Sequence, residues 1–199
     1  MNVITSQYTR LFISSIMAGK KSIFIINGSA SQHSSNERLI DNFISLTNDY
    51  FDVIVFNELK MLPHFDPALS IKDTPEAVIQ FRQNIQSADG VLICTPEYIF
   101  SIPAGLKNAL EWCVSTTIFS GKPTGFITAS ASGLKGHEEL QMLMKTLMAA
   151  FTEKTTLLVQ GVKGKMNKSG EITDSKTREA LVFFIHAYKE HLDSDYAHE

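Results

Sequence analysis

Short apolar runs alternate along the chain with longer stretches whose hydrophobic residues recur every three or four positions. The runs are rich in Ile, Val and Phe and end at polar or small residues, which predicts β-strands. Three runs have unbroken apolar cores, at residues 23–26, 91–94 and 157–159, as in strands that are covered on both faces. The five predicted strands are Ser22–Asn27, Phe51–Phe56, Val91–Thr95, Gly125–Ala129 and Thr155–Gln160.

The stretches between and after these runs predict five amphipathic helices. Each has one apolar stripe at helical spacing, which indicates a helix packed on a sheet. Strands and helices in strict alternation form a parallel sheet with helices on both faces. We therefore predict an α/β fold of three layers, a doubly wound sheet of five parallel strands. The stripes span Leu39–Leu46, Val78–Ile85, Ile102–Cys113, Leu140–Phe151 and Leu181–Leu192.

Composition and charge exclude several classes of protein. The 199 residues are 44% hydrophobic and 20% charged, which is the composition of one ordinary globular domain. A formal net charge of −3 provides no general basic field, so we expect no nucleic-acid ligand. No apolar stretch approaches the roughly 20 residues of a membrane span, so we expect no membrane partner.

The ends of the chain and the two cysteines give the domain limits and the compartment. We expect a loosely held N-terminal extension (1–20), one domain (21–193) and a polar tail (194–199).

Cys94 and Cys113 each lie singly inside an apolar run. This placement indicates buried, unpaired thiols and a cytoplasmic protein.

A serine-rich segment follows the first predicted strand and precedes a helix. Residues 28–36 read GSASQHSSN. A turn from a strand into a helix presents free backbone N–H groups and the positive helix end to an anion, with Ser35 or Asn36 as the expected cap. The segment lacks GxGxxG and GxxxxGK[ST], so neither usual nucleotide fingerprint is present. Its neutral donors suit a terminal phosphate monoester, but a plain serine-rich turn explains the same residues equally well.

Candidate catalytic and metal-ligating residues are few. The segment His137–Gln141 begins like HExxH but ends in Gln, which excludes that zinc-protease motif. The other histidines are scattered, and we assign no metal. Glu97 has no second carboxylate at a spacing useful for acid–base chemistry, so we favour a structural role for its side chain.

The segment after the third predicted strand has a distinctive sequence. Residues 95–112 read TPEYIFSIPAGLKNALEW, which resembles the TPEYN-x-S-x-P-x-x-LKNA-[IL]-[DE]-W signature of the NADPH-dependent FMN reductases. This flavodoxin-like family includes azoreductase-type and chromate-reductase-type quinone reductases. The likeness extends over most of the chain from residue 22 onward, and includes Gly28–Asn36, Leu62–Asp66 and Thr128–Gly136.

The resemblance implies a flavodoxin-like fold with bound FMN, which accepts hydride from NADPH or NADH. A quinone, azo compound, metal oxyanion or free flavin would be the small electron acceptor, and the protein would be a homodimer or homotetramer. Because the flavin supplies the chemistry, we expect no catalytic side chain. The expected FMN-binding residues are Ser29, Ser31, Ser34, Ser35, Asn36, Pro96, Glu97, Tyr98, Ile99, Ser130, Ser132 and Gly133.

Three positions depart from the family pattern. Ser31 replaces a frequent arginine, Ile99 replaces the signature asparagine, and Ala131-Ser132 replaces a Pro-Gly pair. The first change removes a cation near the expected phosphate, and the second removes a polar contact at the flavin edge. Two alternatives therefore stay open. One is a flavodoxin-type FMN electron carrier without significant NAD(P)H oxidation, and the other is a binding module that has kept the fold without the cofactor.

Overall fold

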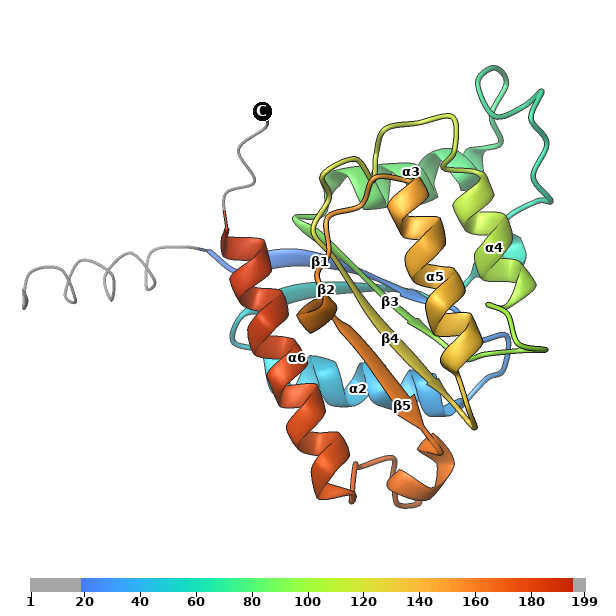
Figure 1. Cartoon of the computed structure of the whole chain (residues 1–199). Helices are drawn as coiled ribbons and strands as arrows, with labels where there is room; N and C mark the ends of the chain where they lie inside the picture. Colours follow the sequence, from blue (N-terminus) through green and yellow to red (C-terminus); the bar gives the residue numbers. More distant parts are fainter. Residues whose placement is uncertain (1–18, 195–199) are drawn as a thin grey trace, which may run out of the picture.

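Five parallel strands form the centre of the structure, a computed structural model that describes residues 19–194 (Figure 1). The strand order is β2-β1-β3-β4-β5, which confirms the predicted doubly wound α/β fold. The predicted extension (1–20) and tail (194–199) lie, apart from Gly19, Lys20 and Ser194, outside the described residues. The strands are β1 (Lys21–Asn27), β2 (Phe51–Phe56), β3 (Gly90–Thr95), β4 (Thr124–Ser130) and β5 (Thr156–Gln160).

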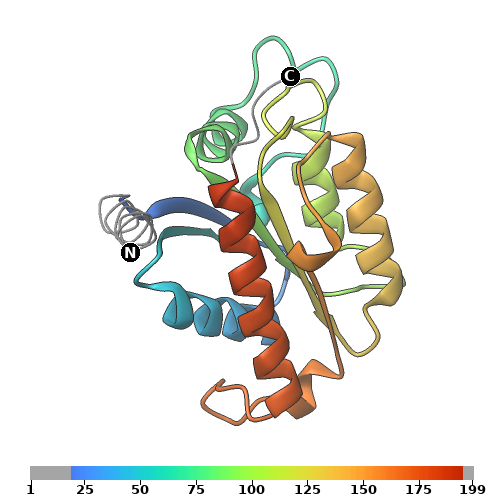
Figure 2. The ribbon, with the colours of Figure 1, turned by 60° about the vertical axis from the view of Figure 1, so that its left-hand side comes forward.

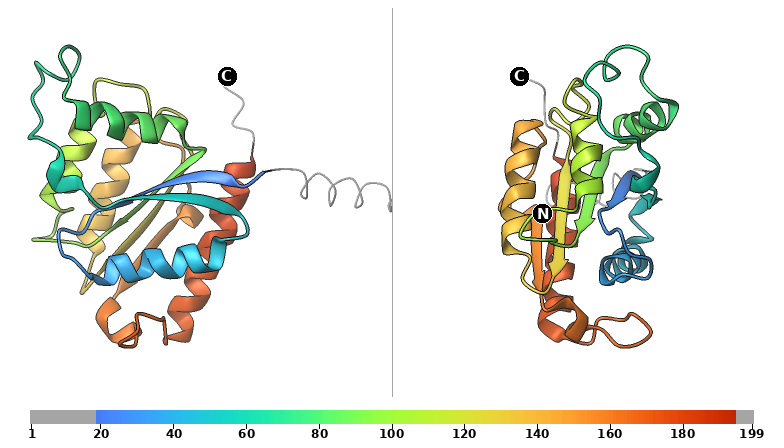
Figure 3. Two further views of the ribbon diagram at one scale, coloured as in Figure 1. Left: turned by 180° about the vertical axis from the view of Figure 1, so that it is seen from behind. Right: turned by 90° about the vertical axis from the view of Figure 1, so that its right-hand side faces the viewer.

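Two layers of helices cover the sheet. Figures 2 and 3 show α2 and α6 together on one face and α3, α4 and α5 on the other. Within residues 19–194 no helix is both long and apolar enough to cross a membrane. The helices are α2 (Ser35–Thr47), α3 (Glu76–Ser87), α4 (Ala104–Glu111), α5 (Leu134–Thr146) and α6 (Ser175–Asp193), with short 3₁₀ turns η1 (Leu59–Met61), η2 (Glu153–Thr155) and η3 (Val162–Lys165).

The alternation of side chains along β1 divides the core into two halves. Ile23 and Ile25 pack towards α2 and α6, whereas Phe24 and Ile26 pack towards the three helices of the other face. All four side chains are buried, and burial of each contributes about 1.5–3 kcal/mol. The predicted helical stripes supply the opposing surfaces, as expected for helices that pack on a sheet.

Two details differ from the sequence-based expectations. The apolar stripe was predicted to extend to Phe151, but α5 ends at Thr146. The chain turns at Met148, which has a φ of +59°. Phe151 still contacts the core through an edge-to-face pair with Phe126, with ring centroids 4.7 Å apart. The run 157–159 was predicted to be covered on both faces, but β5 is an edge strand and two of these three residues are half-buried.

The carboxyl ends of the strands meet at one edge of the sheet, at the lower right in Figure 1. Strand β1 pairs with β2 on one side and with β3 on the other, so the strand order reverses there. Ligands of open parallel sheets bind beyond the carboxyl ends at such a reversal. The loops after β1, β3 and β4 are therefore the place to look for a site.

Candidate active site

Gly28 takes the chain from β1 across the end of β3. Its N–H donates to the carbonyl of Cys94 at 2.8 Å. A Cβ at Gly28 would lie 2.4 Å from the Thr95 Oγ1 and 2.7 Å from the Thr95 Cβ, closer than atoms can pack. Only glycine therefore fits this crossing, which brings the serine-rich loop over the reversal point of the sheet.

Short-range hydrogen bonds shape the serine-rich loop. The Asn27 carboxamide oxygen accepts from the Ser29 N–H at 3.1 Å, and the Ser29 hydroxyl accepts from the Ser31 N–H at 3.3 Å. The Asn27 Nδ2 also donates to Asn57 Oδ1 at 2.9 Å. The loop is thus a folded turn whose remaining donors are free to meet a ligand.

The cap of α2 is Ser34, which corrects the expectation that Ser35 or Asn36 caps the helix. The Ser34 hydroxyl accepts from the Glu37 N–H at 3.1 Å. Asn36 is buried instead and donates to the carbonyl of Ala129 at 3.1 Å, which ties α2 to β4. The N–H groups of Ser35 and Asn36 precede the first intrahelical bond and point out of the helix end.

A cavity of about 740 Å³ lies between this loop and the ends of β3, β4 and β5. We call it the main cavity. Its volume is in the range of ordinary cofactor and ligand sites. It brings together eight of the twelve residues predicted to bind FMN: Ser29, Ser31, Ser34, Ser35, Asn36, Pro96, Tyr98 and Ser130.

Four predicted residues, Glu97, Ile99, Ser132 and Gly133, do not line the main cavity. The Glu97 carboxylate accepts from the N–H groups of Gly133 at 3.1 Å and Gly136 at 2.9 Å. A carboxylate is well placed at this positive helix end. Glu97 thus holds the start of α5 against the loop after β3, as favoured for its side chain from the sequence.

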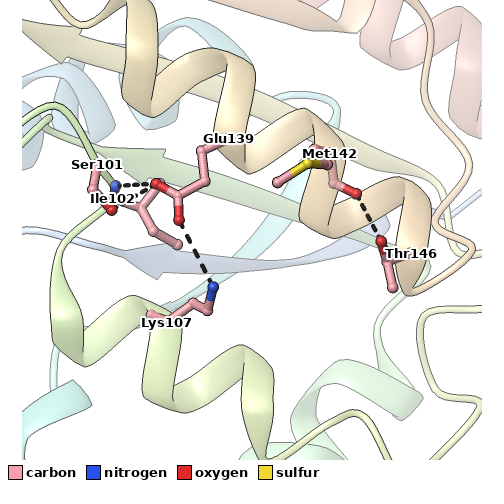
Figure 4. Close-up of polar contacts among 6 residues, drawn as sticks. All are labelled: Ser101, Ile102, Lys107, Glu139, Met142 and Thr146. Carbon is pink, nitrogen blue, oxygen red and sulfur yellow. Dashed lines mark hydrogen bonds and ion pairs between the residues drawn. The ribbon is translucent and has the colours of Figure 1, made fainter.

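A second carboxylate fixes the same loop to α5 and α4 (Figure 4). Glu139 of α5 accepts from the Ser101 hydroxyl at 2.6 Å and from the Ile102 N–H at 3.0 Å, and its other oxygen lies 3.7 Å from Lys107 Nζ. Further along α5, the Thr146 hydroxyl donates to the Met142 carbonyl. The backbone next to Pro96 and Tyr98 is therefore held from two points on one helix.

Ile99 and Phe100 form the tip of the loop between β3 and α4, which projects from the body in Figures 1 and 3. Tyr98 and Ser101 exchange backbone hydrogen bonds of 2.9 and 3.1 Å around them. The two residues have φ values of +52° and +58° and exposed fractions of 96% and 75%. Such a turn favours Asn-Gly, so an isoleucine and a phenylalanine here are both strained and exposed.

The main cavity also contains residues that the sequence did not single out. Gln32 and His33 belong to the serine-rich loop, and Arg38 lies one turn into α2. Lys163 comes from the Gly- and Lys-rich segment after β5 (residues 161–173). The carboxyl ends of parallel strands share one edge, so the loop after β5 reaches the same cavity as the loops after β1, β3 and β4. The remaining lining residues are Ala129, Ala131, Gly161, Val162 and Met166.

A side cavity of about 620 Å³ lies on the other side of the serine-rich loop, towards β2. It shares Ser29, Ser31, Gln32 and His33 with the main cavity. The residues it does not share include Asn57, Glu58 and Lys60 from the segment after β2, together with Glu37, Pro103 and Gly105.

His137 is a buried titratable group next to the Glu97 contact. Its Nδ1 lies 2.8 Å from the Thr128 Oγ1 of β4. Burial lowers the pKa of the imidazole below its ordinary 6.5, and the Glu138 carboxylate opposes this shift only in part. The folded protein therefore holds His137 neutral at pH values where the unfolded chain binds a proton.

This difference predicts a pH dependence of stability. Because the unfolded state binds the extra proton, the free energy of unfolding falls as the pH drops below 6.5 towards the lower folded-state pKa. We expect urea titrations to show a lower free energy of unfolding at pH 5 than at pH 7, and a smaller decrease for His137→Gln. If the free energy of unfolding changed equally with pH in the two proteins, His137 would not be held neutral in the folded state.

Comparison with known proteins identifies the family. Residues 22–161 match the family model of NADPH-dependent FMN reductases. A Burkholderia 2-hydroxy-1,4-benzoquinone reductase is 28% identical over 172 residues, 83% of this chain and 93% of its own. The quinone reductase of Escherichia coli K12 is 26% identical over 181 residues, 87% of this chain and 96% of its own. The chain belongs to the NADPH-dependent FMN reductase family and is an oxidoreductase.

A solved structure agrees with this assignment. The FerB flavoenzyme of Paracoccus denitrificans, described as an NAD(P)H:(acceptor) oxidoreductase, superposes with a TM-score of 0.77 at 25% identity. The match covers 86% of this chain and 97% of that one. The flavodoxin-like fold and the family resemblance deduced from the sequence are thereby confirmed.

Proposed function

We propose that the main cavity binds FMN, and that the protein passes hydride from NADPH or NADH through the flavin to a small acceptor. The proposal depends above all on one observation. The serine-rich loop, the N-terminus of α2 and the loop after β3 line a single cavity that contains no aspartate or glutamate among the residues 19–194. A phosphate monoester fits such a donor set.

The residues present fit FMN at both ends of the cavity. Ser29, Ser31, Ser34 and Ser35 offer hydroxyl and backbone donors for a phosphate, and Gly28 allows the loop to lie close over the sheet. Beside the loop after β3 and the end of β4, apolar and small side chains are suited to a flat ring with polar edges. These are Pro96, Tyr98, Ala129, Ser130 and Ala131.

Bound FMN would supply the reversible uptake of a hydride, and the protein would bind and orient the reactants. Glu97 and Glu139 hold the backbone around Pro96 and Tyr98 in place, so this part of the cavity wall is supported by hydrogen bonds within the protein. Relatives named as quinone reductases support a quinone as the acceptor. An azo compound, a metal oxyanion or free flavin would suit the same exposed cavity.

Anaerobic stopped-flow absorbance separates a reductase from an electron carrier. The protein is loaded with FMN and mixed with NADPH or NADH, and the absorbance of the bound flavin near 450 nm is followed. We expect this absorbance to be lost at a rate that rises with nucleotide concentration, and to return when a quinone is added. No loss of absorbance with either nucleotide would favour the flavodoxin-type carrier and contradict the proposed reaction.

We also propose that the protein self-associates through the tip formed by Ile99 and Phe100. Large apolar side chains that are both exposed and strained favour contact with a partner surface. Exposed Met142 of α5 lies on the helix that holds this loop. A cytoplasmic location accords with the two buried, unpaired cysteines, Cys94 and Cys113.

Replacement of the tip by Asn-Gly tests this role. The double variant Ile99→Asn/Phe100→Gly relieves two unfavourable backbone conformations, so the free energy of unfolding of the subunit should rise by about 1–2 kcal/mol. At the same time, sedimentation velocity should show weaker association. Phe183→Gln removes a similarly exposed aromatic group from α6 and should leave association unchanged. An unchanged oligomer in the double variant would contradict the proposed interface.

A further inference from the structure

The two cavities on either side of the serine-rich loop differ in charge. Arg38 and Lys163 line the main cavity, and no carboxylate opposes them there. In the side cavity, Glu37 and Glu58 outnumber Lys60. In a chain with a net charge of −3, the main cavity is therefore a local concentration of positive charge. An anion that contacts the shared loop is attracted to the main cavity and repelled from the side cavity.

Arg38 is a cation near the positive end of α2. It lies one turn into α2, near the helix end where the dipole is positive and a cation is mildly destabilising. The residue is half-buried, and within residues 19–194 no carboxylate lies within ion-pair distance of its guanidinium. A fixed, unpaired charge beside a helix end and a cavity indicates a ligand of opposite charge.

The stem of Arg38 is held in place by the segment after β5. The Asn42 Nδ2 donates to the Arg38 carbonyl at 2.7 Å and to the Gly170 carbonyl at 2.8 Å. A Cβ built at Gly170, which has a φ of +91°, would lie only 3.1 Å from the Arg38 Cγ. This close packing limits the conformations of the arginine, which lowers the entropy lost when it binds.

Lys163 lines the main cavity from the segment after β5. It lies in η3, whose buried neighbour Val162 anchors the turn. The Gly161 N–H donates to the Ala131 carbonyl at 3.1 Å, which ties this segment to the end of β4. The Lys163 ammonium has no carboxylate within ion-pair distance in the part of the chain that the structure describes.

We propose that Arg38 and Lys163 together form the cationic side of the phosphate site and supply the positive charge that Ser31 lacks. The inference rests on the proposed FMN function. The two cations come from α2 and from the segment after β5, whereas the neutral donors come from the serine-rich loop. The phosphate dianion is thus held between uncharged N–H and hydroxyl groups on one side and two cations on the other.

Titration of apoprotein with FMN and with riboflavin tests this assignment, because riboflavin has the same ring and ribityl chain without the phosphate. Quenching of flavin fluorescence gives Kd for Arg38→Gln, Lys163→Gln and the double variant. We expect each single change to raise Kd for FMN about tenfold and the double change about 50-fold or more. Kd for riboflavin should change less than about twofold, since charge-assisted contacts to the phosphate are the ones lost.

Lys60→Gln is the matched control. It removes the same charge from the side cavity, and Kd for FMN should stay within about twofold of the wild-type value if distance and screening govern the effect. The affinity of the wild-type protein for FMN should also fall with salt more steeply than that of the double variant. The inference is wrong if the Arg38 and Lys163 variants bind FMN like the wild type, or if Lys60→Gln weakens binding equally.

Failure of the inference differs from failure of the proposed function. If wild-type and variant proteins bind FMN and riboflavin with unchanged affinities, the cations have no role but the cofactor site stands. If the wild-type apoprotein binds neither flavin, the proposed function falls, and the cationic phosphate site falls with it.

Discussion

Ser29→Asp is expected to raise Kd for FMN by about 100-fold or more, because it places a negative charge directly against a phosphate dianion. Ser29 lies on the wall shared by both cavities, and its hydroxyl accepts from the Ser31 N–H. A carboxylate at this position can accept the same hydrogen bond. The turn is therefore preserved, and the loss of affinity for FMN measures the effect of the added charge.

Fluorescence titration of the apoprotein measures the effect, with Ser29→Asn as the neutral control of similar size. Ser29→Asn should weaken FMN about tenfold at most, since only uncharged contacts change. Riboflavin should bind Ser29→Asp nearly as well as it binds the wild type. If Ser29→Asp retains FMN with unchanged affinity, the phosphate does not lie in the serine-rich loop.

Gly28→Ala is expected to lower the free energy of unfolding by about 2–4 kcal/mol, because the new Cβ meets a buried side chain in a closely packed position. The contact is with Thr95, whose Oγ1 and Cβ would lie 2.4 and 2.7 Å away. Thr95 belongs to β3 at the centre of the sheet and is wholly buried, so it has little room to move. The variant should also bind FMN poorly, since the serine-rich loop must lift from the sheet.

Urea unfolding measures this loss of stability, and Gly164→Ala provides a control because nothing lies within 4 Å of a Cβ there. The control should change the free energy of unfolding by less than about 0.5 kcal/mol. The double variant Gly28→Ala/Thr95→Gly removes both clashing atoms and should bind FMN better than Gly28→Ala alone. A stable Gly28→Ala protein with normal FMN affinity would show that the crossing over β3 is not tightly packed.

The fold could be predicted from the sequence because its signals are local and repeated. Each observed strand lies within one residue of its predicted limits, since the apolar runs end abruptly at polar residues. The local sequence does not determine whether a strand lies at the centre or at the edge of a sheet. Strand β5 lies at the edge, which explains why Leu157 and Leu158 are less buried than their sequence suggests. The end of α5 was missed for a related reason, because Phe151 contacts the core from beyond the helix.

The lining of the main cavity could be predicted where the position of the backbone alone decides it, and could not be predicted where a side chain comes from a distant segment. The serine-rich loop and Tyr98 follow strands directly, so their place at the sheet edge was expected. Arg38 and Lys163 are separated by more than a hundred residues along the chain, and only the packing of the segment after β5 on α2 brings them to one cavity. The partners of Glu97 were missed for the same reason, because Gly133 and Gly136 at the N-terminus of α5 lie 36 and 39 residues further along the chain.

A crystal of the protein soaked with FMN would show where the phosphate and the ring bind. We expect electron density for the phosphate in the main cavity, against Ser29–Asn36 and near Arg38 and Lys163, with the ring beside Tyr98. A phosphate in the side cavity near Lys60 and Glu58, or a main cavity that stays empty at saturating FMN, would contradict it.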